Sequence, residues 1–353
     1  MAQTLRYFGW EGYGDGAFAS SFRRHTGLEI EHDYHLSDDA ACRTALSHPR
    51  AWDIININSP FVRDVLHPAG AVPVLPKKYV DAVQGSDGAL SRFATPARTF
   101  GGELIGIPQR GGPFNFVINQ NRISVSDARD AGFGIALDRH FYRRFGVLSY
   151  EDFNVMHFAL ASGLNPFEPI SDATMLTFAE ACRTIWNSAR VVSVDHNFLN
   201  RLLIDGDIDF YLSGGVYTAS PARLAGHHEI KAITPSSGPA GGRGGIAFVE
   251  INALNARASS GGGETFLDFI LSDVGAVEAS MAAGACNPVF QMSRKGVFDC
   301  FKREQLHAMQ WDDFEEDMSR CADYAIVPSY RELVDVLRRE LNIENEKRLG
   351  RET

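Results

Sequence analysis

The sequence predicts a doubly wound α/β fold, and the opening part of the chain provides the evidence. An apolar strand that begins near residue 4 runs directly into an aromatic turn, Trp10-Glu11-Gly12-Tyr13. Further strands are expected at residues 28–34 and 53–59, and the stretches between them show helical patterns. Lobes of this kind bind ligands where loops leave the carboxyl ends of the strands. Trp10, Tyr13, Ser59 and Phe61 follow those ends, so a small-molecule site is expected there.

Helix start and stop signals define the segments between these strands. Residues 15–27 place Phe18 and Phe22 four positions apart and end at Gly27. Residues 37–48 begin with Ser37, which suits a helix N-cap, and end before Pro49. A short helical segment is expected at residues 60–66, and residues 73–88 are expected to form a long surface connection.

Two later strands, residues 114–119 and 246–251, are expected to cross between two lobes. A glycine-rich loop precedes each strand, and these loops contain Arg110 and Arg243. Residues 120–145 are polar and basic, which favours a solvated face. The other expected strands are at residues 146–150, 191–194, 208–212 and 230–233, and the other expected helices at residues 152–162, 172–188, 197–205, 263–272, 304–319 and 329–341.

The crossing strands divide the chain into two predicted lobes. Lobe 1 comprises residues 1–115 and about 250–300, and lobe 2 comprises residues 119–245. Residues 301–353 are expected to form C-terminal helices that pack on the lobes. A chain of 353 residues is long enough for two lobes, each with its own core.

Composition argues against several classes of function. The formal net charge of -10 disfavours binding to nucleic acid or to an anionic membrane, because both need a positive field. No apolar run is long enough for a transmembrane helix. The five cysteines form no Cys-x-x-Cys motif, so neither a zinc site nor another cofactor is expected. Cys300 and Cys321 could form a disulfide in a secreted protein, but buried free thiols are the favoured interpretation.

The order of these segments resembles the solute-binding proteins of ABC importers, in the branch that binds spermidine and putrescine. The resemblance rests on five segments, residues 7–13, 53–61, 106–119, 205–210 and 248–257. It implies a two-lobed periplasmic-binding-protein fold of type II, with a doubly wound sheet flanked by helices in each lobe and a ligand cleft between the lobes. It also implies a monomer without enzymatic activity that closes over a small ligand by a hinge motion and delivers it to the membrane subunits of the transporter.

Departures from the family pattern change the expected ligand. The acid and the aromatic residue that the family has before its second crossing strand fall near Gly245, and its other tryptophans fall near Gly111 and Ser213. Its acid pair falls near Glu151 and Asn154, so at most one acid remains. Guanidinium groups bind carboxylate or phosphate in bidentate fashion, and glycine-rich turns present N–H groups to anions. The two loop arginines therefore indicate an anionic or zwitterionic ligand and not a polyamine.

The resemblance and the residue chemistry together define a set of expected ligand contacts. Ser213-Gly214-Gly215 resembles a cradle of hydroxyl and N–H groups, and Asn287 matches the place where the family contributes a late pocket residue. The aromatic residues could instead belong to the core, and Glu151 could serve the helix dipole. The full set is Trp10, Glu11, Tyr13, Ser59, Phe61, Arg110, Gly111, Glu151, Asn154, Ser213, Gly214, Arg243, Gly245 and Asn287.

The location of the protein and an enzymatic alternative stay open at this point. The chain shows no basic and apolar leader, which fits either a periplasmic protein whose signal has been removed or a cytoplasmic protein. Some proteins of this fold are cytoplasmic enzymes that act on small metabolites, phosphorylated or not. The best catalytic candidates are Cys286, His157 and Glu151, which form no recognised triad or metal set. For His157, a partly buried histidine with satisfied hydrogen bonds is the favoured interpretation.

Overall fold

The computed structural model describes residues 4–14, 16–83, 89–258 and 261–349. The chain folds into two units, each built from two separate stretches of sequence. Unit 1 comprises residues 1–112 and 247–319, and unit 2 comprises residues 113–246 and 320–353. Strands β6 (Ile107–Asn119) and β11 (Gly245–Leu254) contribute residues to both units. The predicted lobes and C-terminal helices also include residues 1–3, 15, 84–88, 259–260 and 350–353, which lie outside the described residues.

The sheet of unit 1 has the strand order β2–β1–β3–β11–β6. β1 (Thr4–Gly9) pairs in parallel with both β2 (Glu29–Tyr34) and β3 (Ile54–Asn58). β11 pairs antiparallel with β3, and the register places Glu250 opposite Asn58 and Asn252 opposite Asn56. The carboxyl ends of β1 and β3 and the residue Glu250 therefore lie at one edge of the sheet.

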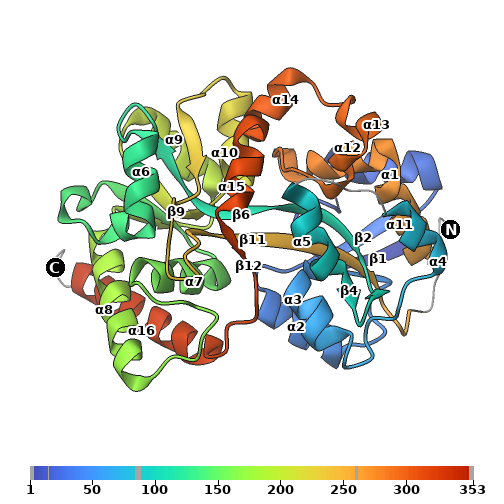
Figure 1. Cartoon of the computed structure of the whole chain (residues 1–353), viewed down its shortest axis with the longest axis horizontal. Helices are drawn as coiled ribbons and strands as arrows, with labels where there is room; N and C mark the ends of the chain where they lie inside the picture. The colour runs from blue at the N-terminus through green and yellow to red at the C-terminus, as the bar shows by residue number, and fades with distance from the viewer. Residues whose placement is uncertain (1–3, 15, 84–88, 259–260, 350–353) are drawn as a thin grey trace. The chain divides into compact units, whose positions relative to one another are not determined.

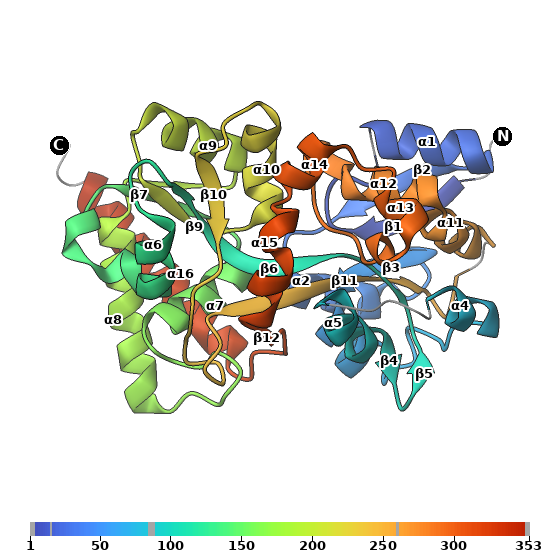
Figure 2. The ribbon, with the colours of Figure 1, turned by 45° about the horizontal axis from the view of Figure 1, so that its top comes forward.

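An aromatic core fixes two helices of unit 1 against each other. Phe18 and Phe22 of α1 (Gly16–Thr26) contact Phe266 and Phe269 of α11 (Gly262–Leu271), with ring centroids 5.4 to 6.0 Å apart (Figures 1 and 2). The spacing of Phe18 and Phe22 in the sequence indicated this buried stripe. The other elements of unit 1 are α2 (Asp38–Ser47), α3 (Ser59–Phe61), the π-helical turn Val62–Leu66, α4 (Lys77–Ala82), α5 (Ala89–Arg98), β4 (Thr99–Phe100), β5 (Glu103–Leu104), α12 (Asp273–Ser280), the 3-10 turns Ala282–Gly284 and Phe290–Ser293, α13 (Lys295–Phe298), α14 (Arg303–Ala308) and α15 (Trp311–Ser319).

The sheet of unit 2 has the strand order β6–β9–β7–β8, and β10 pairs with the part of β6 that belongs to unit 2. β7 (Phe145–Leu148) pairs in parallel with β8 (Val191–Ser193) and with β9 (Phe210–Gly214), whereas β9 and β10 (Ile230–Ile233) are antiparallel to β6. The helices of this unit are α6 (Val125–Ala131), α7 (Glu151–Ala161), α8 (Asp172–Ser188), α9 (His196–Asp205), α10 (Val216–Leu224) and α16 (Tyr330–Leu349), joined by the 3-10 turns Gly132–Leu137 and Arg139–Phe141 and the short strand β12 (Cys321–Asp323).

Helix α16 completes the core of unit 2, although it is far from the other elements in the sequence. It packs along α8, as Figures 1 and 2 show. Trp186 of α8 is 1% exposed, and its indole Nε1 donates to the carbonyl of Leu337 at 3.1 Å. Arg183 pairs with the buried Glu340 at 3.0 Å.

The structure corrects the predicted loop at residues 106–113. Residues 107–113 form the first half of β6, and every residue of this strand is buried. The glycines and Pro108 indicated a turn, but Gly111 has a packing function: a Cβ atom there would lie 2.5 Å from the ring of Phe290 and 3.0 Å from the carbonyl oxygen of Phe248. Arg110 and Gly111 therefore belong to a buried strand and not to an exposed turn.

Two further expectations need correction. The segment 120–145 is not only a solvated face, because Phe133 and Ile135 are buried in unit 2 and the ring of Phe133 stacks on His157 at 4.3 Å. The surface connection expected at residues 73–88 includes helix α4. Both segments are rich in charged or turn-forming residues, and these hid the few apolar side chains that are buried in the structure.

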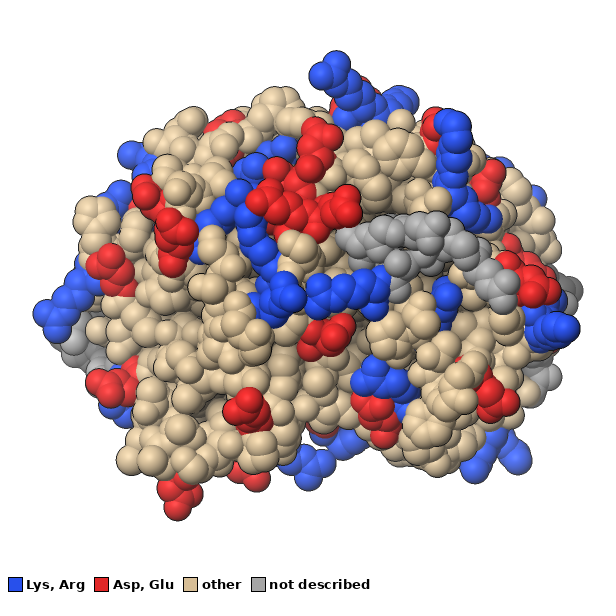
Figure 3. All heavy atoms as spheres, viewed as in Figure 1, with Lys and Arg blue, Asp and Glu red and all other residues tan. Residues whose placement is uncertain are grey.

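Basic and acidic side chains are interspersed on the face of the molecule shown in Figure 3. All five cysteines are free, with Cys300 exposed and the other four buried, so Cys300 and Cys321 are not joined. None of the described helices combines the length and the apolar character that crossing a membrane requires.

Candidate functional site

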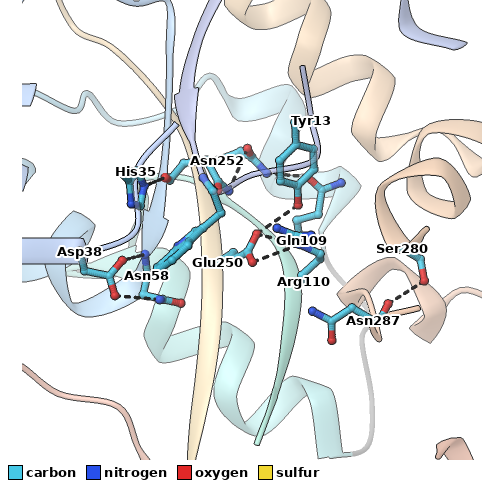
Figure 4. Close-up of polar contacts among 12 residues, drawn as sticks. Tyr13, His35, Asp38, Asn58, Gln109, Arg110, Glu250, Asn252, Ser280 and Asn287 are labelled. Atoms are coloured by element: carbon cyan, nitrogen blue, oxygen red, sulfur yellow. Dashed lines mark hydrogen bonds and ion pairs between the residues drawn. The ribbon is translucent and has the colours of Figure 1, made fainter. Parts of the chain in front are cut away.

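The carboxyl edge of the unit 1 sheet brings together polar side chains from four strands or strand ends. Trp10 and Tyr13 follow β1, Asn58 ends β3, Glu250 lies on β11 and Arg110 lies on β6. Figure 4 shows most of these side chains, with Glu250 between Asn58 and Arg110. The parallel strands β1 and β3 bring their carboxyl-end residues to this edge, and the antiparallel register of β11 with β3 places Glu250 opposite Asn58 there.

Arg110, Glu250 and Tyr13 form the centre of this edge. The Nε of Arg110 donates to both carboxylate oxygens of Glu250 at 3.1 Å, and the Tyr13 hydroxyl donates to Oε2 at 3.1 Å. The guanidinium also lies over the Tyr13 ring, 4.6 Å from its centroid, in a cation–π arrangement. The side chains of Arg110 and Glu250 are only 10% and 7% exposed. The pair is therefore a buried ion pair with an aromatic floor.

The charges of this centre are matched within unit 1. Burial alone would lower the pKa of Arg110, but the adjacent Glu250 carboxylate raises it above its ordinary value, so the guanidinium stays protonated. Burial raises the pKa of Tyr13 well above its ordinary value, so its hydroxyl keeps the proton that it donates. We expected Arg110 to need an anion from the ligand. Glu250 already supplies that charge, so burial no longer demands a ligand anion.

The outer edge of the Arg110 guanidinium is nevertheless open to a further partner. Its hydrogen bonds to described residues all come from Nε, and its two terminal nitrogens donate to none of them. Residues 288 and 289 are held beside Arg110, because the main-chain N–H of Gly111 donates to the Pro288 carbonyl and Arg110 forms an isolated antiparallel β-bridge with Val289. The Asn287 side chain points away from Ser280 (Figure 4), and its amide makes no hydrogen bond to a described residue. Arg110 and Asn287 thus offer unused donors at the same edge.

A network of amides supports this centre. Asn252 accepts hydrogen bonds from Tyr7 at 3.1 Å and from Asn56 at 3.2 Å, and donates to Gln109 at 2.6 Å. Asn56 also accepts from the main-chain N–H of Trp10 at 3.3 Å. These side chains are buried, so their bonds are strong and fix the strand ends relative to one another.

The aromatic residues of the opening turn are buried. Tyr13 is fully buried in the core of unit 1, where its ring packs against Tyr7 and Phe18. Trp10 is 9% exposed and packs at 4.7 Å against His35. Nε2 of His35 donates to the Asn56 carbonyl, and burial lowers the pKa of His35 to about 4, so the ring is neutral. Ser59 and Phe61 are buried in α3, and Glu11 is exposed.

Two of the expected ligand contacts in unit 2, Asn154 and Ser213, meet at the end of β9. Asn154 donates to the Ser213 hydroxyl at 2.8 Å and to the Leu148 carbonyl at 2.9 Å, and His157 Nδ1 lies 3.1 Å from the same hydroxyl. Ser213 has a φ of 65°, a backbone conformation that non-glycine residues seldom adopt. The fully buried His157 has a pKa lowered to about 3 by burial, and its Nε2 has no partner among the described residues. The expectation that all its hydrogen bonds are satisfied is therefore wrong.

Glu151 and Arg243 are the two charged residues of unit 2 that were expected to contact the ligand. Glu151 forms a two-point ion pair with Arg338 of α16, at 2.6 and 2.7 Å. Arg243 is exposed and forms a turn with Ala240. An exposed guanidinium is hydrated, so its position gives no independent reason for an anionic partner.

Packing explains two glycines, Gly214 and Gly245, that were expected at the ligand. A Cβ atom at Gly214 would lie 2.5 Å from the Tyr211 ring, and one at Gly245 would lie 2.8 Å from Thr234 and 2.9 Å from the sulfur of Cys321. Neither position accommodates a side chain, so each glycine has a structural reason that does not depend on a ligand.

The catalytic candidates of the enzymatic alternative do not form a reactive group. Cys286 belongs to unit 1, and burial raises the pKa of its thiol to about 12, which suppresses the nucleophilic thiolate. Its sulfur donates to the sulfur of Met281 at 3.2 Å. His157 and Glu151 belong to unit 2 and have the partners given above. No group of three or more metal-ligating side chains occurs among the residues that the structure describes.

Sequence reasoning missed Glu250 and the buried amides Asn56, Asn58 and Asn252. Glu250 is flanked by apolar residues within its strand, so no sequence motif marked it. Asn58 looked like the end of a strand and Asp38 like the start of a helix, so neither was singled out as a site residue. Glu250, Asn56 and Asn252 share one signal that could have identified them: each is a polar residue with an apolar neighbour on both sides inside a buried strand.

Comparisons with known proteins extend this description. No protein-family model and no curated protein matches the sequence. The fold is similar to that of the spermidine/putrescine substrate-binding protein PotD of Streptococcus pneumoniae, with a TM-score of 0.66, 11% identity and coverage of 96% of this chain and 99% of that one. It is also similar to AgtB of A. tumefaciens R10, solved with agropinic acid, with a TM-score of 0.62, 12% identity and coverage of 98% and 99%.

An enzyme shares the same fold. A eukaryotic thiaminase-I, solved with the thiamin analogue 3-deazathiamin, has a TM-score of 0.62, 13% identity and coverage of 97% of this chain and 99% of that one. The predicted periplasmic-binding-protein fold, and its resemblance to polyamine-binding proteins, are confirmed by these full-length matches. The fold alone does not distinguish a solute-binding protein from an enzyme.

Proposed function

We propose that this protein is the solute-binding component of an ABC importer and that it captures a small anionic or zwitterionic ligand at the carboxyl edge of unit 1. The observation that supports this most directly is the state of Arg110. Its Nε is fixed by Glu250, and its two terminal nitrogens have no partner among the described residues. A guanidinium fixed in this way is pre-organised to bind a carboxylate through two parallel hydrogen bonds.

The same geometry disfavours a polyamine. Glu250 is the buried carboxylate of this edge, and Arg110 and Tyr13 occupy both of its oxygens. An ammonium group would have to displace a guanidinium from a buried ion pair, which leaves a buried charge without its partner. Spermidine and putrescine should therefore fail to bind at micromolar concentration, and calorimetry with both compounds tests this.

Native mass spectrometry of the protein as purified, followed by calorimetry, tests the proposed site. The first measurement seeks a ligand that co-purifies, and the second titrates a panel of amino acids, amino-acid conjugates, agropinic acid, glucopine and phosphorylated small molecules. Arg110→Lys keeps a positive charge beside Glu250 but loses the planar fork, so it should weaken binding by about tenfold or more. Asn287→Ala should weaken binding by roughly two- to tenfold, the effect of one lost hydrogen bond.

Arg6→Lys is the matched control. Arg6 also pairs with a buried carboxylate, that of Asp53, at 2.9 Å, but Asp53 precedes β3 and so lies at the opposite edge of the sheet. Loss of this fork should leave ligand affinity unchanged. Equal affinity of wild type, Arg110→Lys and Asn287→Ala for every bound compound would show that the ligand does not use this edge.

The remaining parts of the proposal follow from the resemblance. The protein would work outside the cytoplasm as a monomer and would deliver its ligand to membrane subunits of the transporter. Hinge closure and the ligand contacts expected from unit 2 stay predictions, and small-angle X-ray scattering with and without ligand measures the closure. The buried, protonated thiol of Cys286 gives the enzymatic alternative no nucleophile among the proposed residues.

A further inference from the structure

The side-chain amide of Asn58 has a fixed orientation. Its Nδ2 donates to Oδ2 of Asp38 at 2.8 Å, and its main-chain N–H donates to Oδ1 of Asp38 at 3.2 Å. Asp38 is the first residue of α2 and is 0% exposed. A carboxylate only accepts hydrogen bonds, so it selects the amide orientation in which the nitrogen faces Asp38 and the oxygen points away (Figure 4).

The oxygen of this amide has no partner among the residues that the structure describes. Asn58 is 1% exposed, and its buried Oδ1 accepts no hydrogen bond from a described residue. Burial of an acceptor without a donor costs free energy. Rotation of the amide cannot relieve this cost, because it would place the oxygen against the Asp38 carboxylate. A donor from another molecule would relieve it.

The position of Asn58 relates this unused acceptor to Arg110. Asn58 lies directly opposite Glu250 in the β3–β11 ladder, and β11 lies between β3 and β6. The edge therefore has an unused acceptor on β3, the carboxylate of Glu250 on β11 and unused donors of Arg110 on β6. A molecule that complements this order has a hydrogen-bond donor at one end and an anionic group at the other.

We infer that Asn58, oriented by Asp38, accepts a hydrogen bond from an amino group of the ligand, so that the site selects zwitterions over simple anions. The inference rests on the proposed function and specifies its ligand class. Asn58 is the specificity-determining residue, and Asp38 is a positioning residue that acts through it. Arg110 binds the carboxylate of the same molecule.

The test compares molecules that differ only in the amino group. The probes are L-glutamate against glutarate, L-glutamine against glutaramate, and L-alanine against propionate, each titrated into the full chain by calorimetry. At least one amino acid should bind about tenfold or more tightly than its des-amino partner, because the partner leaves the Asn58 acceptor unsatisfied. Asn58→Leu should reduce that ratio to about threefold or less, chiefly by weakening binding of the amino acid.

Two further variants separate positioning from general damage. Asp38→Asn relaxes the constraint on the Asn58 amide and should lower the amino-acid preference by roughly threefold or more, while affinity for the des-amino acid changes little. Asn255→Leu is the matched control. Asn255 is also buried, and its amide donates to the carbonyls of Pro49 and Trp52 at the opposite edge of the sheet. Its loss should leave the preference unchanged.

The outcomes distinguish this inference from the proposed function. The inference is overturned if no amino acid binds better than its des-amino partner, or if the preference survives in Asn58→Leu. If carboxylate probes still bind in an Arg110-dependent way in that case, the proposed site stands without it. Carboxylate binding that is insensitive to Arg110→Lys contradicts the proposed function instead, whatever Asn58 contributes.

Discussion

The buried pair of Arg110 and Glu250 gives the sharpest prediction of stability. Glu250→Leu removes the charged partner that Arg110 has among the described residues, and the Arg110 side chain is 10% exposed. It also removes the acceptor of the Tyr13 hydroxyl. Loss of one partner of a buried pair costs about 3–5 kcal/mol, because the other charge stays buried without compensation. We expect Arg110→Met to cost a similar amount.

The double variant Arg110→Met/Glu250→Leu should be far less damaging than the sum of the single variants. Replacing both charges by apolar groups of similar size removes the uncompensated charge. The cost that remains is the buried Tyr13 hydroxyl without its acceptor, about 1–3 kcal/mol. The double variant should therefore be more stable than either single variant.

Urea denaturation followed by circular dichroism and tryptophan fluorescence measures these differences. Because the two units could unfold separately, the transition of unit 1 is the one to compare. Glu29→Ala in unit 1 is the control. Its pair with Arg23 is 47–67% exposed, so its loss should cost at most about 1 kcal/mol. The reasoning is refuted if the single variants are as stable as wild type, or if the double variant loses the sum of both.

Three further predictions concern other parts of the chain. Gly111→Ala should lower stability by about 1–3 kcal/mol, because its Cβ would lie 2.5 Å from the Phe290 ring. Gly112→Ala is the control: its Cβ would lie 3.8 Å from its nearest neighbours, so its melting temperature should change little, and equal shifts for the two variants would contradict the packing explanation. The pKa of His157 falls from 6.5 to about 3 on folding, so below pH 6.5 the unfolded chain binds the proton first. Stability of unit 2 should fall by up to about 5 kcal/mol between pH 6.5 and 3, and His157→Phe should flatten this loss in denaturation curves measured across that range. Under native conditions a thiol reagent should label Cys300 alone, and labelling of a second cysteine before unfolding would contradict the observed burial.

The fold could be predicted from the sequence because its signals are local and repeated. Phe18 and Phe22 marked the buried stripe of α1, and Ser37 is the N-cap of α2, where its side chain accepts from the N–H of Ala40. Two elements at residues 107–113 and 77–82 were missed because glycine and proline there reflect close packing or short helices as well as turns. Local residue preferences cannot separate these cases.

The candidate site was predictable only in part. Arg110 and Asn287 were expected as ligand contacts and both lie at this edge, but the partner of Arg110 was not foreseen, because Glu250 is 140 positions away in the sequence. The antiparallel register of β3 and β11 brings Glu250 to the site, and a single sequence contains no signal for that register. Tyr13 was predicted to line a pocket because of its glycine-rich surroundings, yet its ring is part of the core and only its hydroxyl and one ring face serve the site.

The contribution of α16 to unit 2 has a consequence for the order of events during synthesis. Trp186 of α8 is covered by a helix that belongs to residues 320–353, and the whole second stretch of unit 1 lies between the two in sequence. During synthesis the apolar face of α8 therefore leaves the ribosome long before α16 is made and can cover it. Unit 2 cannot reach its native state while the chain is still growing through unit 1. During that interval the apolar face of α8 stays uncovered, and truncation before residue 320 should leave it permanently in that condition.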